Sequence, residues 1–167
     1  MTIPEKYLFK DDGSIPNSRF PLLLYKNALP EKGNAGAIWL ENRFAKNNWT
    51  NSWRNGIFTY HHYHSITHEV LGVYQGNALV HLGGEKGSKL WIEAGDVVVI
   101  PAGVGHKKLE SSTDFKVVGA YPNGSAYDIL RGKPEERPKA DDNIAKVPIP
   151  EFDPILGPNE GLLKIWS

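Results

Sequence analysis

The sequence of 167 residues contains no cysteine. This absence excludes disulfide bonds, thiol nucleophiles and thiolate metal sites, and it agrees with a cytoplasmic location. Excess charge is lacking as well, because 19 Lys and Arg residues balance 19 Asp and Glu residues. A neutral chain offers no overall electrostatic reason to bind nucleic acid or an anionic membrane. We therefore expect a small-molecule partner, no nucleic acid and no membrane.

Long apolar runs are also missing. The longest, such as 21–25 and 97–102, are far shorter than the roughly 20 residues that a membrane-spanning helix needs. The first residues, MTIPEKYLFKDDGS, carry charges throughout, so they do not form the apolar core of a secretory signal. These features predict a cytoplasmic protein.

The length predicts one domain over residues 1–167, because the chain is too short for two ordinary domains. Turn residues in the first part predict an N-terminal arm and a first strand within residues 1–30. Residues 56–121 carry the candidate site. The proline-rich remainder, 122–167, ends in many apolar residues, and we expect it to pack in extended form on the main domain or on a partner subunit.

Local patterns predict one short helix from Asn34 to Asn47, with Asn34 as its N-cap, and a helical turn from Ser125 to Arg131. Four asparagines then predict a loop over 47–55 that carries two tryptophans. Short apolar runs separated by glycine turns predict strands in an all-β fold. The expected strands are 20–26, 57–64, 69–74, 78–82, 90–92, 97–100, 106–109 and 115–121.

The stretch GIFTYHHYHSITHEVLGVYQG, residues 56–76, contains the first candidate site residues. In a strand, His62 and His64 point to the same face with Cα atoms about 6.6 Å apart, so both imidazoles can reach one ion. Glu69 opens the next apolar run, and a hairpin returning from His64 would lay it beside the histidines.

The stretch GDVVVIPAGVGHKKLE, residues 95–110, supplies a third histidine, His106, after a Pro101–Gly103 turn. Three imidazole nitrogens and one carboxylate oxygen suit a transition metal and do not suit Ca²⁺ or Mg²⁺. We predict that His62, His64, Glu69 and His106 bind one divalent transition metal such as Fe, Mn, Ni or Zn.

Together the two stretches resemble both signature motifs of the cupin superfamily. The glycines, the HxH pair, the glutamate, the PxG turn and the last histidine all stand at the family's spacing. The resemblance implies an antiparallel β-barrel or jelly roll of about eight strands with one or two short helices and a C-terminal extension. It also implies a homodimer, and it gives the four predicted ligands the same role. One departure is Glu110, which stands where the second motif usually has asparagine.

Strand parity extends the site beyond the ligands. Phe58 and Tyr60 share the parity of His62, and Lys108 and Glu110 share that of His106, so we expect all four to face the cavity. Tyr60 and Glu110 are candidate catalytic bases. Phe58, Tyr60 and Lys108 are candidate substrate-pocket residues. Core packing is the plainer role for Phe58 and an equal alternative for Tyr60, and a salt bridge with Glu110 is the plainer role for Lys108.

Three other histidines receive plainer interpretations. By alternation His61 faces away from His62, and we expect both His61 and His68 on the exterior of the barrel, although a bulge next to Glu69 would turn His68 inward. His81 is expected to be structural. Trp49 and Trp53 either cover the cavity or pack against the barrel wall.

Three functions remain open at this point. The first is a metal-dependent enzyme of the dioxygenase type that acts on a small molecule. The second is a metal-dependent isomerase or epimerase of a sugar or small acid, in which Tyr60 or Glu110 moves the proton. The third is a cupin that binds a small ligand or has a structural role without turnover.

Overall fold

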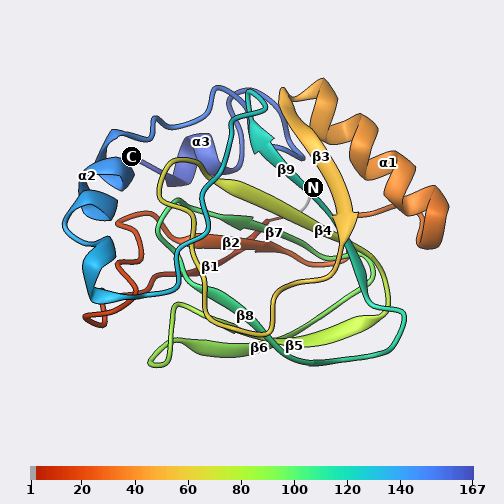
Figure 1. Ribbon diagram of the computed structural model, residues 1–167. Helices are drawn as coiled ribbons and strands as arrows, with labels where there is room; N and C mark the ends of the chain where they lie inside the picture. Colours follow the sequence, from red (N-terminus) through yellow and green to blue (C-terminus); the bar gives the residue numbers. More distant parts are fainter. Residues whose placement is uncertain (1–2) are drawn as a thin grey trace.

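The computed structural model describes residues 3–167 and contains mostly antiparallel strands (Figure 1). The strands are β1 (Glu5–Tyr7), β2 (Leu22–Tyr25), β3 (Trp49–Asn55), β4 (Glu69–Gln75), β5 (Asn77–Leu82), β6 (Ser88–Glu93), β7 (Val97–Ile100), β8 (His106–Ser111) and β9 (Lys116–Pro122). The helices are α1 (Gly33–Lys46), the 3₁₀ turn η1 (Pro134–Glu136), α2 (Lys139–Lys146) and α3 (Leu162–Ile165). The predicted all-β class is confirmed.

The strands form two sheets, one above the other in Figure 1. The larger sheet has the order β1-β2-β7-β4-β9-β3, and the smaller has the order β6-β5-β8. Every pairing is antiparallel. Neighbouring strands such as β2 and β7 are distant in sequence, so the larger sheet is held together by long-range contacts.

The inner strands β2, β4 and β7 of the larger sheet are buried on both faces, which explains why they are mostly apolar instead of alternating. Its inner face packs on the smaller sheet, and its outer face packs on α1 and the C-terminal segment. Residues of the inner face include Leu24, Leu71, Val98 and Val117, and residues of the outer face include Leu23, Val70, Val99 and Val118.

Helix α1 rests on the outer face through Ala37, Leu40 and Phe44. It can approach closely because Gly72 in β4 has no side chain; a Cβ there would lie 2.6 Å from Cδ2 of Leu40. The predicted N-cap was wrong, since the helix begins at Gly33 and the cap residue is Lys32. The side chain of Asn34 instead accepts a hydrogen bond from Arg54 at 2.9 Å.

The predicted loop over 47–55 was wrong, because most of it is strand β3, paired with β9. The asparagines that suggested a loop have local roles. Asn48 and Asn51 both adopt positive φ, at 58° and 59°, which asparagine tolerates better than most residues. The ladder is irregular between Thr50 and Trp53, so Asn51 lies at a bulge and not in a loop.

The predicted strand over 57–64 was also wrong, and this segment makes only isolated bridges. His62 pairs with His106 on one side, and Tyr63 pairs with Leu130 of the C-terminal segment on the other. The segment therefore lies between β8 and the C-terminal segment without joining a sheet over its length.

The C-terminal segment packs on the barrel of its own chain. Trp166 stacks on Phe20, with ring centroids 5.2 Å apart, and the hydroxyl of Tyr25 donates to Asp153 at 2.5 Å. The segment includes α2 and α3, where the sequence predicted an extended chain, and the helical turn predicted over 125–131 does not form. None of the helices in residues 3–167 has the length and apolar character to cross a membrane.

Candidate metal centre

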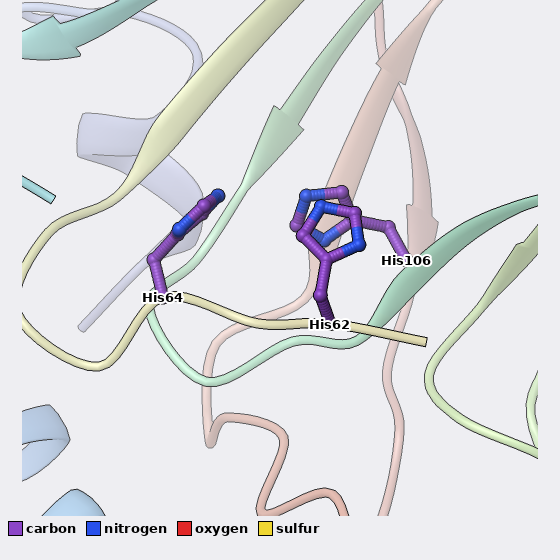
Figure 2. A group of neighbouring side chains, drawn as sticks. All are labelled: His62, His64 and His106. Carbon is purple, nitrogen blue, oxygen red and sulfur yellow. The ribbon is translucent and has the colours of Figure 1, made fainter. Parts of the chain in front are cut away.

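Three buried histidines converge at one end of the barrel (Figure 2). His62 and His64 lie on the irregular segment before β4, and His106 is the first residue of β8. A ring nitrogen from each lies within 4.8 Å of the others. The alternation argument therefore predicted the right convergence, although the backbone between His62 and His64 is not part of a regular strand.

Each of the three imidazoles is oriented by a backbone carbonyl. Nδ1 of His62 donates to the carbonyl of Tyr60 at 3.1 Å, and Nδ1 of His106 donates to that of Val104 at 3.1 Å. Nδ1 of His64 donates to the carbonyl of Asp128 at 2.5 Å. A metal-ligating histidine commonly has this arrangement, because it leaves Nε2 free to face an ion.

Glu69, the first residue of β4, completes the cluster. Its Oε1 lies 3.2 Å from Nε2 of His64 and 3.1 Å from Nε2 of His106. The hydroxyl of Tyr121 donates to Oε2 at 3.0 Å. Nε1 of Trp53 in turn donates to that hydroxyl at 2.8 Å, so a chain of hydrogen bonds from β3 through β9 positions the carboxylate.

The charges in the cluster depend on one another. Burial disfavours the charged form of Glu69, yet the nearby His64 and His106 outweigh this and lower its pKa. Burial likewise opposes the charged form of His64, but the charge and hydrogen bond of Glu69 raise its pKa. His62 has its pKa lowered to about 2 by burial and by its histidine neighbours. The buried carboxylate thus requires a positive charge beside it.

This donor set fits a divalent transition metal. Three imidazoles have Nε2 free of backbone contacts, and the one carboxylate needs a cation that a metal ion can supply in place of a proton. The buried His62, His64 and His106 cluster can hold such an ion.

A cavity of about 520 Å³ opens from two of these histidines, His62 and His106. Phe58 and Lys108 line it. Tyr60 lies beside the cavity and, among the described residues, is not part of its lining. Its ring stacks on Phe58 at 5.0 Å and carries the guanidinium of Arg131 on one face.

The predicted inward orientation of Glu110 was wrong. The ladder between β5 and β8 shifts register, so that Lys108 pairs with Val80 while Glu110 pairs with Leu79. Paired residues share a face, and Val80 is in the core, so Lys108 points inward and Glu110 points outward. Sequence parity could not detect this bulge. Ser111, which pairs with Ala78, lines the cavity instead.

The sequence interpretation missed several residues that shape the centre. Tyr121 holds Glu69, and Tyr127 stacks on Tyr121 at 4.8 Å and borders the cavity. Asp128 holds His64 through its carbonyl, and its carboxylate accepts from the backbone N–H of Ser65 at 2.7 Å. These residues come from β9 and the C-terminal segment, and no local motif marks them.

The two tryptophans and His68 also have defined places. Trp49 is buried in the core, while Trp53 borders the cavity. The exterior position expected for His68 was wrong, because His68 is buried next to Trp166 with ring centroids 4.9 Å apart.

Comparison with known proteins gives one relative of nearly equal length. The chain is 51% identical over 163 residues to the uncharacterized protein YjlB of Bacillus subtilis (strain 168), a match that covers 97% of this chain and 96% of YjlB. No protein-family model matches the chain.

Two solved structures illustrate the more distant similarities. Acireductone dioxygenase from Bacillus anthracis with cadmium ion in its active centre is 14% identical, with a TM-score of 0.42 over 63% of this chain and 79% of that one. Procruciferin, an 11S globulin from Brassica napus, is 22% identical, with a TM-score of 0.39 over 48% of this chain. The chain spans only 21% of procruciferin.

Proposed function

The chain belongs to the family of YjlB, and on that premise we propose that it is a metal-dependent enzyme of the cupin type acting on a small organic anion, with chemistry of the dioxygenase type. The observation that carries the proposal is the convergence of three buried imidazoles, each with Nδ1 on a backbone carbonyl, two of which line a cavity.

In this proposal His62, His64, His106 and Glu69 hold one divalent transition metal. The bound ion would supply Lewis acidity and positions at which substrate and dioxygen can bind. Glu69, which contacts His64 and His106 in this structure, would be the fourth ligand, and the hydrogen bond from Tyr121 would keep its second oxygen in place. Proton loss from His64 accompanies ion binding, since the imidazole must be neutral to act as a ligand.

The cavity lining supports an anionic substrate with an apolar part. Lys108 and Lys116 both border the cavity, whereas the third cation, Arg54, is already paired with Glu41 at 2.8 Å. The apolar side chains of Ile57, Leu71 and Phe115 line the same space. A small carboxylate of about ten heavy atoms or more suits a cavity of this size and charge.

The isomerase interpretation receives less support from the geometry. It requires a side chain that moves a proton on the substrate. Of the two candidate bases, Glu110 faces away from the cavity and Tyr60 lies outside its lining. A reaction carried by the metal itself needs neither residue.

The test begins with elemental analysis of untagged protein purified without chelator, followed by anaerobic Fe(II) loading and measurement of oxygen uptake with a panel of small carboxylic acids. We expect about one iron per chain after loading, counted separately from zinc, and oxygen uptake with at least one acid. The double variant His62→Ala/His106→Ala should lose the iron and the uptake. Unchanged iron content in that variant would place the iron elsewhere.

A second pair of variants tests the substrate class. Lys108→Ala should raise KM for an anionic substrate by about 10-fold or more, because it removes a charge from the cavity. Lys107→Ala is the matched control, since Lys107 is the neighbouring lysine on the opposite face of β8. If Lys108→Ala and Lys107→Ala have the same KM while metal content and oxygen uptake persist, the proposal of an anionic substrate is wrong. The proposal of a metal-dependent enzyme then still stands.

A further inference from the structure

A second group of metal-ligating side chains lies on the outer side of the smaller sheet. His61, His81 and Glu85 each offer a ligand atom, and these atoms lie within 4.8 Å of one another. None of the three belongs to the proposed central site. The expectation that His61 faces away from His62 holds, but His61 meets other ligands there instead of solvent alone.

The fold brings these residues together from three places. His81 lies near the end of β5, and Gly83 and Gly84, both with φ of 84°, turn the chain so that Glu85 lies beside it. His61 immediately precedes His62, which is bridged to β8. Oε2 of Glu85 lies 2.7 Å from Nε2 of His61, and the rings of His61 and His81 are 4.9 Å apart, edge to face.

Two features of the histidines leave nitrogen lone pairs available. Nδ1 of His61 is buried and, within residues 3–167, has no hydrogen-bond partner. A buried nitrogen without a hydrogen-bond partner is unusual. Either a bound group such as an ion contacts it, or the missing hydrogen bond destabilises the fold. Burial and the neighbouring His61 lower the pKa of His81, so its imidazole is neutral near pH 7.

The surrounding charges determine which ion can bind. Lys89 and Lys107 pair with His81 in the two ladders, and their charges oppose any cation. With a single carboxylate against two lysines, a hard ion that depends on charge, such as Ca²⁺, is disfavoured. An ion that binds imidazole nitrogen through covalent character, such as Zn²⁺, is favoured.

We propose that His61, His81 and Glu85 form a second, three-ligand site for Zn²⁺ or a similar borderline ion, independent of the central site. Water would complete the tetrahedral shell, as at other zinc sites with two histidines and one glutamate. An ion there ties the β5–β6 turn to the segment that carries His62 and His64. Its role is therefore to fix that segment on the sheet.

The experiment uses full-length, untagged protein in the His62→Ala/His106→Ala background, in which the central site is removed. After treatment with chelator, Zn²⁺ binding is measured by isothermal titration calorimetry. We expect about one Zn²⁺ per chain and a rise in the midpoint of thermal unfolding with Zn²⁺ concentration. Absence of saturable Zn²⁺ binding in this background would overturn the proposal.

Added substitutions then assign the ligands. Glu85→Gln should weaken Zn²⁺ binding at least about 10-fold, and because the Glu85 side chain is 78% exposed, the change leaves the fold intact. His81→Ala should remove the binding. Glu93→Gln, an exposed glutamate at the other end of the same hairpin, is the matched control and should bind Zn²⁺ as the background does. Equal affinities in Glu85→Gln and Glu93→Gln would overturn the assignment.

Discussion

At the scale of single residues, His68 shows how packing fixes one form of a histidine. Its Nδ1 accepts from the N–H of Ala102 at 2.9 Å, and its Nε2 donates to the carbonyl of Pro148 at 3.0 Å. Both contacts require the neutral tautomer with the proton on Nε2. A second proton would have to bind Nδ1, where it would repel the N–H of Ala102 and break that hydrogen bond. The buried ring therefore resists protonation.

This arrangement predicts a pH dependence of stability. Burial lowers the pKa of His68 from 6.5 to about 4, so between these values the unfolded chain binds a proton that the folded chain does not. The free energy of unfolding of the metal-free protein should therefore fall as pH drops from about 6.5 to about 4, by up to roughly 3 kcal/mol from this residue. Urea unfolding across this range measures the fall. His68→Gln should show a shallower decline, and an equal decline in both proteins would contradict the assignment.

Tyr121 gives a second prediction at this scale. Its hydroxyl holds Oε2 of Glu69 and accepts from Trp53, so Tyr121→Phe should weaken metal binding at the central site by roughly 10-fold while keeping the ring's packing. Competition with a metal indicator dye measures the affinity. Tyr127→Phe is the control, because Tyr127 stacks on Tyr121 and also loses only a hydroxyl. Equal affinities for the two variants would show that the hydroxyl of Tyr121 does not support the ligand.

At the scale of elements, the contact between α1 and β4 depends on the missing side chain of Gly72. Gly72→Ala would force Leu40 to move, since the new Cβ would lie 2.6 Å from its Cδ2. We expect a loss of about 1–3 kcal/mol in the free energy of unfolding, measured with urea. Gly56→Ala is the matched control, because a Cβ at Gly56 meets nothing within 4 Å. A loss at Gly72 no larger than that at Gly56 would mean that α1 adjusts freely.

The bulge in β8 is the element that most changed the site. Up to Lys108 the strand follows simple alternation, so His106 and Lys108 both point inward. Beyond Leu109 the alternation is shifted by one residue, and Ser111 takes the inward position that parity assigned to Glu110. A single extra residue in one strand thus decides which polar group borders the cavity.

At the scale of the whole molecule, the C-terminal segment closes the outer face of the larger sheet. Trp166 is 2% exposed, stacks on Phe20, and donates from Nε1 to the carbonyl of Pro21 at 2.8 Å. Trp166→Ala should lower the free energy of unfolding by about 3–5 kcal/mol in urea unfolding. Trp91→Ala is the control, since Trp91 is 54% exposed and its loss should cost less than about 1 kcal/mol. Similar losses would show that the segment adds little to the fold.

The same segment changes the argument for a dimer. The sequence suggested that its apolar residues need a partner's surface, but Leu162 and Trp166 are buried against the barrel of their own chain. A homodimer stays a prediction that rests on the family resemblance alone. Light scattering at micromolar concentration tests it, and a monomer would contradict it.

The sequence by itself determined the fold class and the cluster of histidines. Alternation between strand faces and the spacing of residues within a motif are local properties, so they can be recognised from the sequence alone. They were enough to predict that His62, His64 and His106 lie together. The tertiary structure alone decided the rest. Tyr121 and Asp128 meet the motifs, and His81 and Glu85 meet His61, only through contacts between distant parts of the chain. The bulge in β8 depends on how β8 aligns with β5. Neither these long-range contacts nor this alignment can be predicted from the local sequence pattern.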